Sequence, residues 1–257
     1  MIDVNQYTLA LFRAESKEQL LGNLDKVFRD EMRVHFHDEL AEMWAGKLAY
    51  EGEGVNYALD GEATDIHLRW SILPGYEETW ARALVSITDV TARKKAERYM
   101  QYLGTHDVMT GLYNRAYFEE ERGRLERGRR HPVSIVVADL DGLKQANDTL
   151  GHEAGDDLLR RAAEVLKAAF RKEDLVARIG GDEFAILMPD TDEAIAVQAV
   201  QRIQGLIRVN NNFYQGAPLG MSVGVATAQK GAALAEVQRL ADDRMYSEKR
   251  AHHRQRR

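Results

Sequence analysis

The sequence contains no cysteine, which excludes disulfide bonds and catalysis by a thiol. It has no apolar run near the roughly 20 residues that a membrane-spanning helix requires, and no N-terminal signal-peptide pattern. An excess of positive charge is also missing, because the formal net charge is −6 despite the basic residues 250–257, so general nucleic-acid binding has no support. These absences predict a soluble, cytoplasmic protein, and 257 residues allow one large domain or two small ones.

The most informative stretch is Gly180-Gly181-Asp182-Glu183, which lies between two apolar segments. Residues 175–179 and 184–188 have the composition of antiparallel strands, and we expect the two glycines to supply the positive φ angles of a short hairpin turn. Asp182 and Glu183 would then lie at an exposed tip, where glycine backbone lets a ligand approach closely. Taken alone, the tetrapeptide is equally consistent with an ordinary acidic turn.

A second acidic position follows a mainly apolar run, residues 133–138, which is rich in β-branched residues and predicts a buried central strand. Asp139 lies where this strand ends, and a carboxylate there is costly unless it is paired or binds a metal. Hard cations such as Mg²⁺ take oxygen ligands and usually keep waters and substrate phosphates. Asp139 and the Asp182/Glu183 pair together therefore predict a site for a metal–nucleotide complex.

With both acidic motifs in place, the sequence resembles the GGDEF-domain diguanylate cyclases from about residue 103 to about residue 249. The matching motifs occur in the family's order: residues 105–115, 139–141, Lys144, Asn147-Asp148, Gly151-His152, Gly155-Asp156, 180–184, 222–226, 241–243, Tyr246 and Lys249.

Helical spacing of apolar residues predicts further elements in this region. We expect helices near residues 114–127, 156–170, 192–209 and 232–250, and a strand near residues 219–227. With the strands above, this is an α+β fold in which helices flank a central, mainly antiparallel sheet. The resemblance adds that the fold is the nucleotide-cyclase relative of the polymerase palm.

The N-terminal region has a different pattern. Residues 1–50 show helical spacing, and residues 55–59, 66–70 and 83–87 alternate in the manner of strands. This order, and the string at residues 86–91, resemble the C-terminal part of a PAS sensor domain. The β-hairpin that usually opens a PAS domain is missing, so we expect either a truncated form or a sheet that a partner subunit completes. We assign it no ligand.

Residues 92–103 predict a connecting helix, which either pairs as a short coiled coil or serves as a rigid spacer. The expected organisation is thus a partial PAS-like domain at residues 1–90, a linker helix at 91–104 and a GGDEF domain at 105–257. Because each cyclase domain offers half a site, the resemblance implies a homodimer that forms through the PAS-like segment and linker helix and turns two cyclase domains toward each other.

The resemblance implies that the protein condenses two GTP into cyclic di-GMP and releases two pyrophosphates, with Mg²⁺ or Mn²⁺ as cofactor. The implied metal ligands are Asp139, the Leu140 carbonyl, Asp182 and Glu183, and the last two are also the catalytic residues, with Asp182 as candidate general base. The implied GTP-binding residues are Lys144, Asn147, His152, Asp156, Gly180, Gly181 and Lys249. Among these, Asn147 and Asp156 match positions that bind the guanine edge, and an acidic acceptor for guanine N–H groups favours GTP over ATP.

A regulatory site is implied by Arg171 and Asp174, which match the family's inhibitory RxxD motif, and by Arg202 on the following helix. Cyclic di-GMP would bind there as product and inhibitor, with arginine as a bidentate donor. For so short a motif, a solvated charged loop is the ordinary alternative.

One departure from the family pattern follows Lys249. The family continues Lys-x-x-Gly-Arg, whereas here the next residues are Arg250-Ala251-His252-His253, so the second phosphate-binding arginine has no match at His253. Arg250 or Arg254 is an available substitute. The alternative function is a catalytically inactive domain that binds GTP or cyclic di-GMP as a sensor, and a third is a pure dimerisation module.

Overall fold

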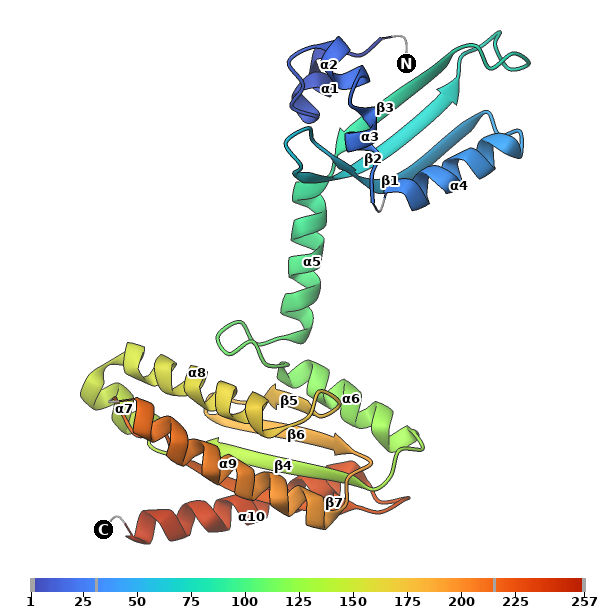
Figure 1. The fold of residues 1–257 in the computed structure, drawn as a ribbon. Helices are drawn as coiled ribbons and strands as arrows, with labels where there is room; N and C mark the ends of the chain where they lie inside the picture. The colour runs from blue at the N-terminus through green and yellow to red at the C-terminus, as the bar shows by residue number, and fades with distance from the viewer. Residues whose placement is uncertain (1–2, 31, 215, 256–257) are drawn as a thin grey trace. The chain divides into compact units, whose positions relative to one another are not determined.

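The computed structural model describes residues 3–30, 32–214 and 216–255, and the side chains of residues 33–35, 253 and 255 lie outside the described part, including that of His253. The chain divides into two compact units, Met1–Met100 and Gln101–Arg257. Figure 1 labels the elements of each unit. Within the described residues, no helix has both the length and the apolar character that crossing a membrane requires.

The N-terminal unit is formed by short helices followed by a sheet. Its elements are α1 (Gln6–Leu11), α2 (Lys17–Leu21), α3 (Leu24–Val27), α4 (Met32–Trp44), β1 (Ala49–Tyr57), β2 (Ala63–Ile72) and β3 (Ala83–Asp89). The expected helix-then-strand order is confirmed, but β1 begins well before residue 55. The strands form an antiparallel sheet in the order β1-β2-β3. Alternate residues of β2, from Ile66 to Ile72, form a buried apolar cluster on one face.

Helix α5 (Thr91–Thr105) follows β3 directly and confirms the helix expected at residues 92–103. Arg93 and Lys94 form ion pairs with Glu53 of β1, which ties the start of α5 to the sheet. Its side chains Tyr99, Met100 and Leu103 are 57%, 69% and 38% exposed. Pairing of this helix with a second copy stays a prediction.

The C-terminal unit alternates helices and strands around one four-stranded sheet. Its elements are α6 (Arg115–Arg127), β4 (Val133–Leu140), α7 (Leu143–Leu150), α8 (His152–Ala169), β5 (Leu175–Arg178), β6 (Glu183–Pro189), α9 (Glu193–Phe213), β7 (Met221–Ala228) and α10 (Leu234–Gln255). The strand order is β5-β6-β4-β7, and every neighbouring pair is antiparallel. The predicted mainly antiparallel sheet with flanking helices is confirmed.

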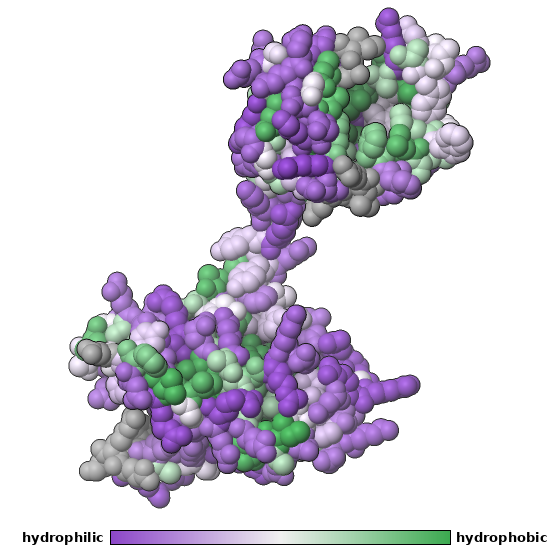
Figure 2. Space-filling model, viewed as in Figure 1, coloured by the Kyte–Doolittle hydropathy of each residue, from purple (hydrophilic) through white to green (hydrophobic). Residues whose placement is uncertain are grey.

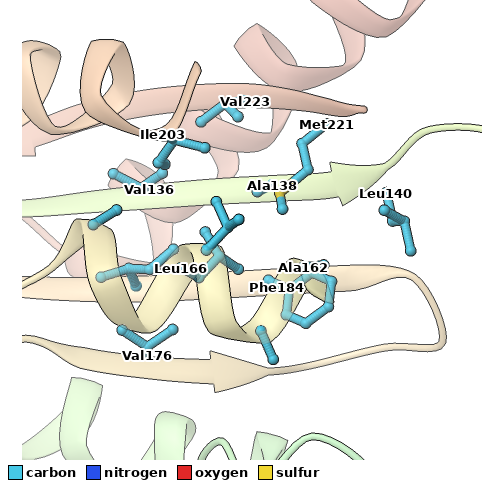
Figure 3. Close-up of a cluster of buried hydrophobic side chains, with 14 of the residues drawn as sticks. Val136, Ala138, Leu140, Ala162, Leu166, Val176, Phe184, Ile203, Met221 and Val223 are labelled. Atoms are coloured by element: carbon cyan, nitrogen blue, oxygen red, sulfur yellow. The ribbon is translucent and has the colours of Figure 1, made fainter. Parts of the chain in front are cut away.

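Strand β4 lies at the centre of this unit, and all of its residues are buried. Val136, Ala138 and Leu140 face the cluster formed with α7, α8 and α9, part of which is drawn in Figure 3. Val133, Ile135 and Val137 face a second cluster formed with α6 and α10. The surface of this unit visible in Figure 2 is mainly hydrophilic, since most apolar side chains are enclosed between the layers.

The helix starts follow local capping chemistry. Asn114 accepts from the Tyr117 N–H and Asp192 accepts from the Ile195 N–H, so α6 and α9 begin where expected. Helix α8 begins at His152, four residues before the predicted start, because Gly151 at φ +88° allows the chain to turn directly from α7 into α8. Helices α9 and α10 continue past residues 209 and 250, since neither region contains a glycine or proline that would end them.

Candidate functional site

The ends of three strands bring acidic residues together. In the sheet register, Asp139 of β4 lies opposite Glu183 of β6 on one side and Ser222 of β7 on the other. The carbonyl of Asp182 accepts from the Leu140 N–H at 2.9 Å, which ties the glycine-acidic loop to the end of β4. The two acidic motifs, 43 residues apart in sequence by their numbers 139 and 182, therefore form one edge of the sheet.

Asp139 is 4% exposed, and its carboxylate accepts from Lys249 Nζ of α10 at 2.6 Å. Burial raises the pKa of Asp139, and the charges of Asp182 and Asp141 add to this, so the bond from Lys249 offsets only part of the effect. Burial opposes protonation of Lys249, but its bond to Asp139 and the same carboxylates outweigh burial and raise the pKa of Lys249. One ammonium thus faces three carboxylates, which leaves a surplus of negative charge.

The glycine-acidic loop is as short as expected, but its conformation differs. Strand β5 ends at Arg178 and β6 begins at Glu183, so four residues connect them. Neither Gly180 nor Gly181 has a positive φ, and that expectation was wrong. Instead, the N–H groups of Ile179 and Gly180 both donate to the Glu183 carbonyl, at 2.9 and 3.2 Å. The Glu183 side chain packs over Gly180, because a Cβ atom at Gly180 would lie 2.6 Å from Glu183 Oε2 and 3.1 Å from Glu183 Cβ and would displace that side chain.

Arg178 fixes this loop, a role that the sequence analysis missed. Its guanidinium donates to the Gly181 carbonyl at 2.6 and 3.2 Å, and to the Asp107 carboxylate at 3.2 and 3.3 Å. Asp107 also accepts from the Thr110 N–H at 2.9 Å and the Thr110 hydroxyl at 2.6 Å. The segment that enters the C-terminal unit is therefore connected to the acidic loop through one arginine.

An aromatic stack lies beside this connection. The His106 ring stacks on Tyr102 at the end of α5, with centroids 4.2 Å apart, and contacts Tyr113 at 4.7 Å. Tyr113 then stacks on Tyr117 of α6 at 4.5 Å. Within this unit, the last turn of α5 is thus packed against α6 and, through Arg178, linked to the loop that carries Asp182.

Four of the residues implied for GTP binding lie on the α7–α8 hairpin, whereas Gly180 and Gly181 lie in the acidic loop and Lys249 lies on α10. Gly142, with φ +78°, begins α7 without a side-chain cap, so the first-turn N–H groups are available to an anion. Asn147 packs closely on Gly155, since a Cβ atom there would lie 2.1 Å from Asn147 Oδ1. The structure therefore places Asn147 against Gly155, the residue that precedes Asp156 in α8, while Lys144 and His152 are exposed near the helix starts.

The three residues predicted for the inhibitory site also come together. The Arg171 N–H donates to Asp174 Oδ2 at 2.9 Å, and Arg202 Nε of α9 donates to the Ala169 carbonyl at 2.6 Å. Burial raises the pKa of Asp174, although the Arg171 amide and the Arg171 and Arg202 charges act in the opposite direction. Both arginines are exposed, so their guanidinium groups are accessible to a ligand.

Comparison with known sequences now decides the family. The profile described as "Diguanylate cyclase, GGDEF domain" matches residues 104–255, more than half of the chain. The chain belongs to the GGDEF family. Residues 104–255 are called the GGDEF domain below, and the PAS-like assignment of the N-terminal unit stays a prediction.

Two relatives and two solved structures show how far the similarity extends. The chain is 32% identical over 209 residues to the probable diguanylate cyclase DgcE of Escherichia coli K12, covering 78% of this chain and 19% of that protein. It is 33% identical over 170 residues to the diguanylate cyclase DgcM of the same strain, covering 65% and 41%. The chain therefore spans less than half the length of either relative.

Among solved structures, the coiled coil and GGDEF domain of DgcB from Caulobacter crescentus, in complex with c-di-GMP, matches with a TM-score of 0.55 and 26% identity over 63% of this chain and 89% of that one. Diguanylate cyclase SiaD from Pseudomonas aeruginosa, in complex with its activator SiaC, matches with a TM-score of 0.54 and 28% identity over 62% and 64%.

The acidic edge of the GGDEF domain has the donor chemistry of a divalent-cation site. Over residues 3–30, 32–214 and 216–255, no three histidine or acidic side chains form a ready-made metal cage. Mg²⁺ usually binds through one or two carboxylates together with substrate phosphates, so an acidic strand end with a surplus of negative charge suits it better than a full protein cage would. Asp139, the Leu140 carbonyl and the carboxylates of Asp182 and Glu183 are the residues that fit.

Proposed function

We propose that this protein is a diguanylate cyclase that condenses two GTP into cyclic di-GMP and releases two pyrophosphates. The observation that supports this most directly is the sheet edge at which Asp139, Asp182 and Glu183 meet, beside an α7 N-terminus suited to phosphate. In each of two condensations, a ribose 3′-hydroxyl attacks the α-phosphate of the other GTP. A phosphorus–oxygen bond forms to the 3′ oxygen, the α–β phosphoanhydride bond breaks, and the hydroxyl proton leaves.

The residues have separable roles in this proposal. Asn147 and Asp156 bind the guanine edge, and Lys144, Lys249 and the first-turn amides of α7 bind the triphosphate. Gly180 and Gly181 let the loop backbone approach the phosphates, and His152 lies at the rim of the same hairpin. Asp182 accepts the proton of the 3′-hydroxyl, since it is half-buried next to the strand end where the α-phosphate would lie.

Asp139, the Leu140 carbonyl, Asp182 and Glu183 are proposed to hold Mg²⁺ or Mn²⁺. A divalent cation bound there would supply positive charge to the triphosphate and to the pyrophosphate that leaves. Lys249 now balances Asp139, and on nucleotide binding its ammonium has the reach to contact phosphate oxygens from the same position. Arg171, Asp174 and Arg202 form the proposed product-inhibition site, at which cyclic di-GMP would bind.

Because one domain holds one GTP, we propose that a homodimer brings two GGDEF domains together for the reaction. We keep the assignment of residues 1–90 as a partial PAS-like sensor and residues 91–104 as a linker helix. It is supported by the order of short helices followed by an antiparallel sheet, and by α5 continuing directly from β3.

The test is to incubate the full chain with GTP and Mg²⁺ and to separate the nucleotides by chromatography. We expect cyclic di-GMP from the wild type and none from the Asp182→Ala/Glu183→Ala double variant. The matched control is Glu77→Ala/Glu78→Ala, which removes the same charge from an exposed loop of the N-terminal unit and should leave product formation unchanged. Bound GTP or cyclic di-GMP without product would favour the alternative, an inactive sensor domain.

A further inference from the structure

His252 occupies the position at which the family pattern Lys-x-x-Gly-Arg has its glycine, and here it lies in the last turns of α10. Its Nδ1 atom lies 3.2 Å from Asp141 Oδ2 and 3.2 Å from Ser222 Oγ. The Ser222 hydroxyl donates to Asp141 Oδ1 at 2.8 Å. Because an ionised carboxylate only accepts hydrogen bonds, Nδ1 must carry the proton in its contact with Asp141.

This cluster is enclosed on the side of the sheet. The Asp141 side chain is 8% exposed and Ser222 is fully buried, whereas the His252 ring is 37% exposed. Asp141 is itself fixed, since its N–H donates to the Gly220 carbonyl at 2.8 Å. A second contact supports the same turn of α10, because the Glu248 carboxylate accepts from the Val223 N–H of β7. His252 therefore contacts groups that are already held in place.

Lys249 lies three residues before His252, so the two side chains project from the same face of α10. Lys249 donates to Asp139 at the end of β4 while His252 reaches Asp141 two residues later. A glycine in a helix interior is destabilising relative to alanine, because it loses more backbone freedom on folding. With histidine in place of that glycine, the helix continues to Gln255 and the last turn gains a side-chain anchor.

We propose that His252 is a positioning residue whose Nδ1–H bond to Asp141 fixes the last turn of α10 and so holds Lys249 at the phosphate-binding edge. The inference extends the proposed function to a residue that the family pattern does not supply. It also explains how this chain orders its terminal turn without the family's glycine and arginine. The competing role for His252 is direct contact between Nε2 and a phosphate.

Two amide substitutions separate these roles. The side-chain nitrogen of asparagine falls near the position of histidine Nδ1, and that of glutamine near Nε2. His252→Asn should therefore restore the bond to Asp141, whereas His252→Gln should behave like His252→Ala. Ala251→Asn, at the exposed neighbouring position, places the same amide where it has no such partner and serves as the matched control.

The experiment measures KM and kcat for GTP and, without nucleotide, hydrogen exchange of a peptide covering residues 246–255. We expect His252→Ala to raise KM about tenfold, which corresponds to about 1.4 kcal/mol, with little change in kcat and faster exchange. His252→Asn should stay within about threefold of wild type in KM with near-native exchange. Combining His252→Ala with Lys249→Met should raise KM no further than Lys249→Met alone, because both changes remove one function.

Three results would overturn the proposal. Rescue by glutamine and not by asparagine would assign His252 to the phosphate through Nε2. Faster exchange with an unchanged KM would reduce it to a structural role, and wild-type values in all variants would exclude any role. If the wild type makes no cyclic di-GMP, the cyclase proposal fails separately. In that case the variants must rank in the same order in their calorimetric affinity for GTP with Mg²⁺. Equal affinities in all variants would show that His252 does not position Lys249.

Discussion

Replacing Arg178 by alanine should loosen the loop that carries Asp182 and destabilise the GGDEF domain. The guanidinium joins the Gly181 carbonyl to the Asp107 carboxylate, and the two side chains, Arg178 and Asp107, are only 13% and 25% exposed. The variant therefore removes both contacts and leaves a largely enclosed carboxylate without its cation. Activity should fall with stability, because Asp182 is adjacent to the carbonyl that Arg178 holds.

The expected size follows from these contacts. Hydrogen bonds that involve charged groups contribute about 1.5–3 kcal/mol each. Because Asp107 keeps its hydrogen bonds from Thr110 and is partly solvated, we expect the free energy of unfolding to fall by about 2 kcal/mol rather than by the sum of the hydrogen bonds that Arg178 makes. For a unit of this size, 1 kcal/mol corresponds to a change in Tm of about 2–4 °C. Arg178→Ala should therefore lower the Tm of the C-terminal unit by about 4–8 °C.

The assay can distinguish the two units of the chain. All three tryptophans, at positions 44, 70 and 80, belong to the N-terminal unit, so tryptophan fluorescence follows that unit alone. Far-UV circular dichroism follows both units. We expect Arg178→Ala to lower the dichroism transition assigned to the C-terminal unit, and Arg178→Lys to recover little, since one ammonium cannot replace the planar fork that meets two acceptors.

The control is Arg124→Ala on α6. Among the described residues, Arg124 pairs with Glu121 one turn earlier; the Arg124 side chain is 69% exposed although that of Glu121 is 16% exposed, and a pair within one helix whose cation is solvated contributes about 0.2–1 kcal/mol. Equal Tm values for Arg178→Ala and Arg124→Ala would refute the reasoning. So would strict additivity of Arg178→Ala and Asp107→Ala, because partners in one contact must show a coupling free energy.

Three further outcomes are expected. Gly155→Ala should raise the dissociation constant for GTP by tenfold or more in calorimetry, because the new Cβ atom would lie 2.1 Å from Asn147 Oδ1 and would displace it. An unchanged dissociation constant would show that Asn147 does not belong to the guanine site. Asp174→Ala should abolish inhibition by added cyclic di-GMP while initial rates stay near wild type, and persistent inhibition would place the product site elsewhere. Burial alone would raise the pKa of Asp107, but bonds from Thr110 and the Arg178 charge hold that pKa below its usual range. The stability that this lowered pKa contributes is present above about pH 4 and is lost as pH falls through the pKa of the folded protein. In urea denaturation, the free energy of unfolding of Asp107→Asn should therefore fall less between pH 5 and pH 3 than that of the wild type. Parallel pH profiles of the two proteins would contradict this.

Features with a local cause could be predicted from the sequence. The β-branched run before Asp139 predicted β4, and the helical spacing of apolar residues predicted α6 and α9, because each depends on residues that are close in sequence. The loop at Gly180 was predicted with the wrong conformation, since φ there is set by hydrogen bonds to Glu183 and space beside its side chain rather than by glycine content.

Contacts between distant residues could not be predicted in this way. Arg178 and Asp107 are 71 positions apart, and His252 and Asp141 are 111 apart. Each pair joins a strand end to another segment that reaches it only after the whole domain has folded. A charged residue that becomes buried needs a partner. The neighbouring sequence shows neither that the residue will be buried nor which residue will be its partner.

Strand parity explains why α10, and not α7, supplies the cation to Asp139. In β4, residues 136, 138 and 140 face α7, α8 and α9, so residues 133, 135, 137 and 139 face α6 and α10. In a strand buried on both faces, both parities are largely apolar, and the sequence therefore does not indicate which parity faces which helix. A shift of one residue in register would turn Asp139 away from Lys249 and toward the apolar cluster around Phe184. The register of β4 with β6 and β7 thus fixes both the charge balance of the acidic edge and the side from which α10 can reach a bound triphosphate.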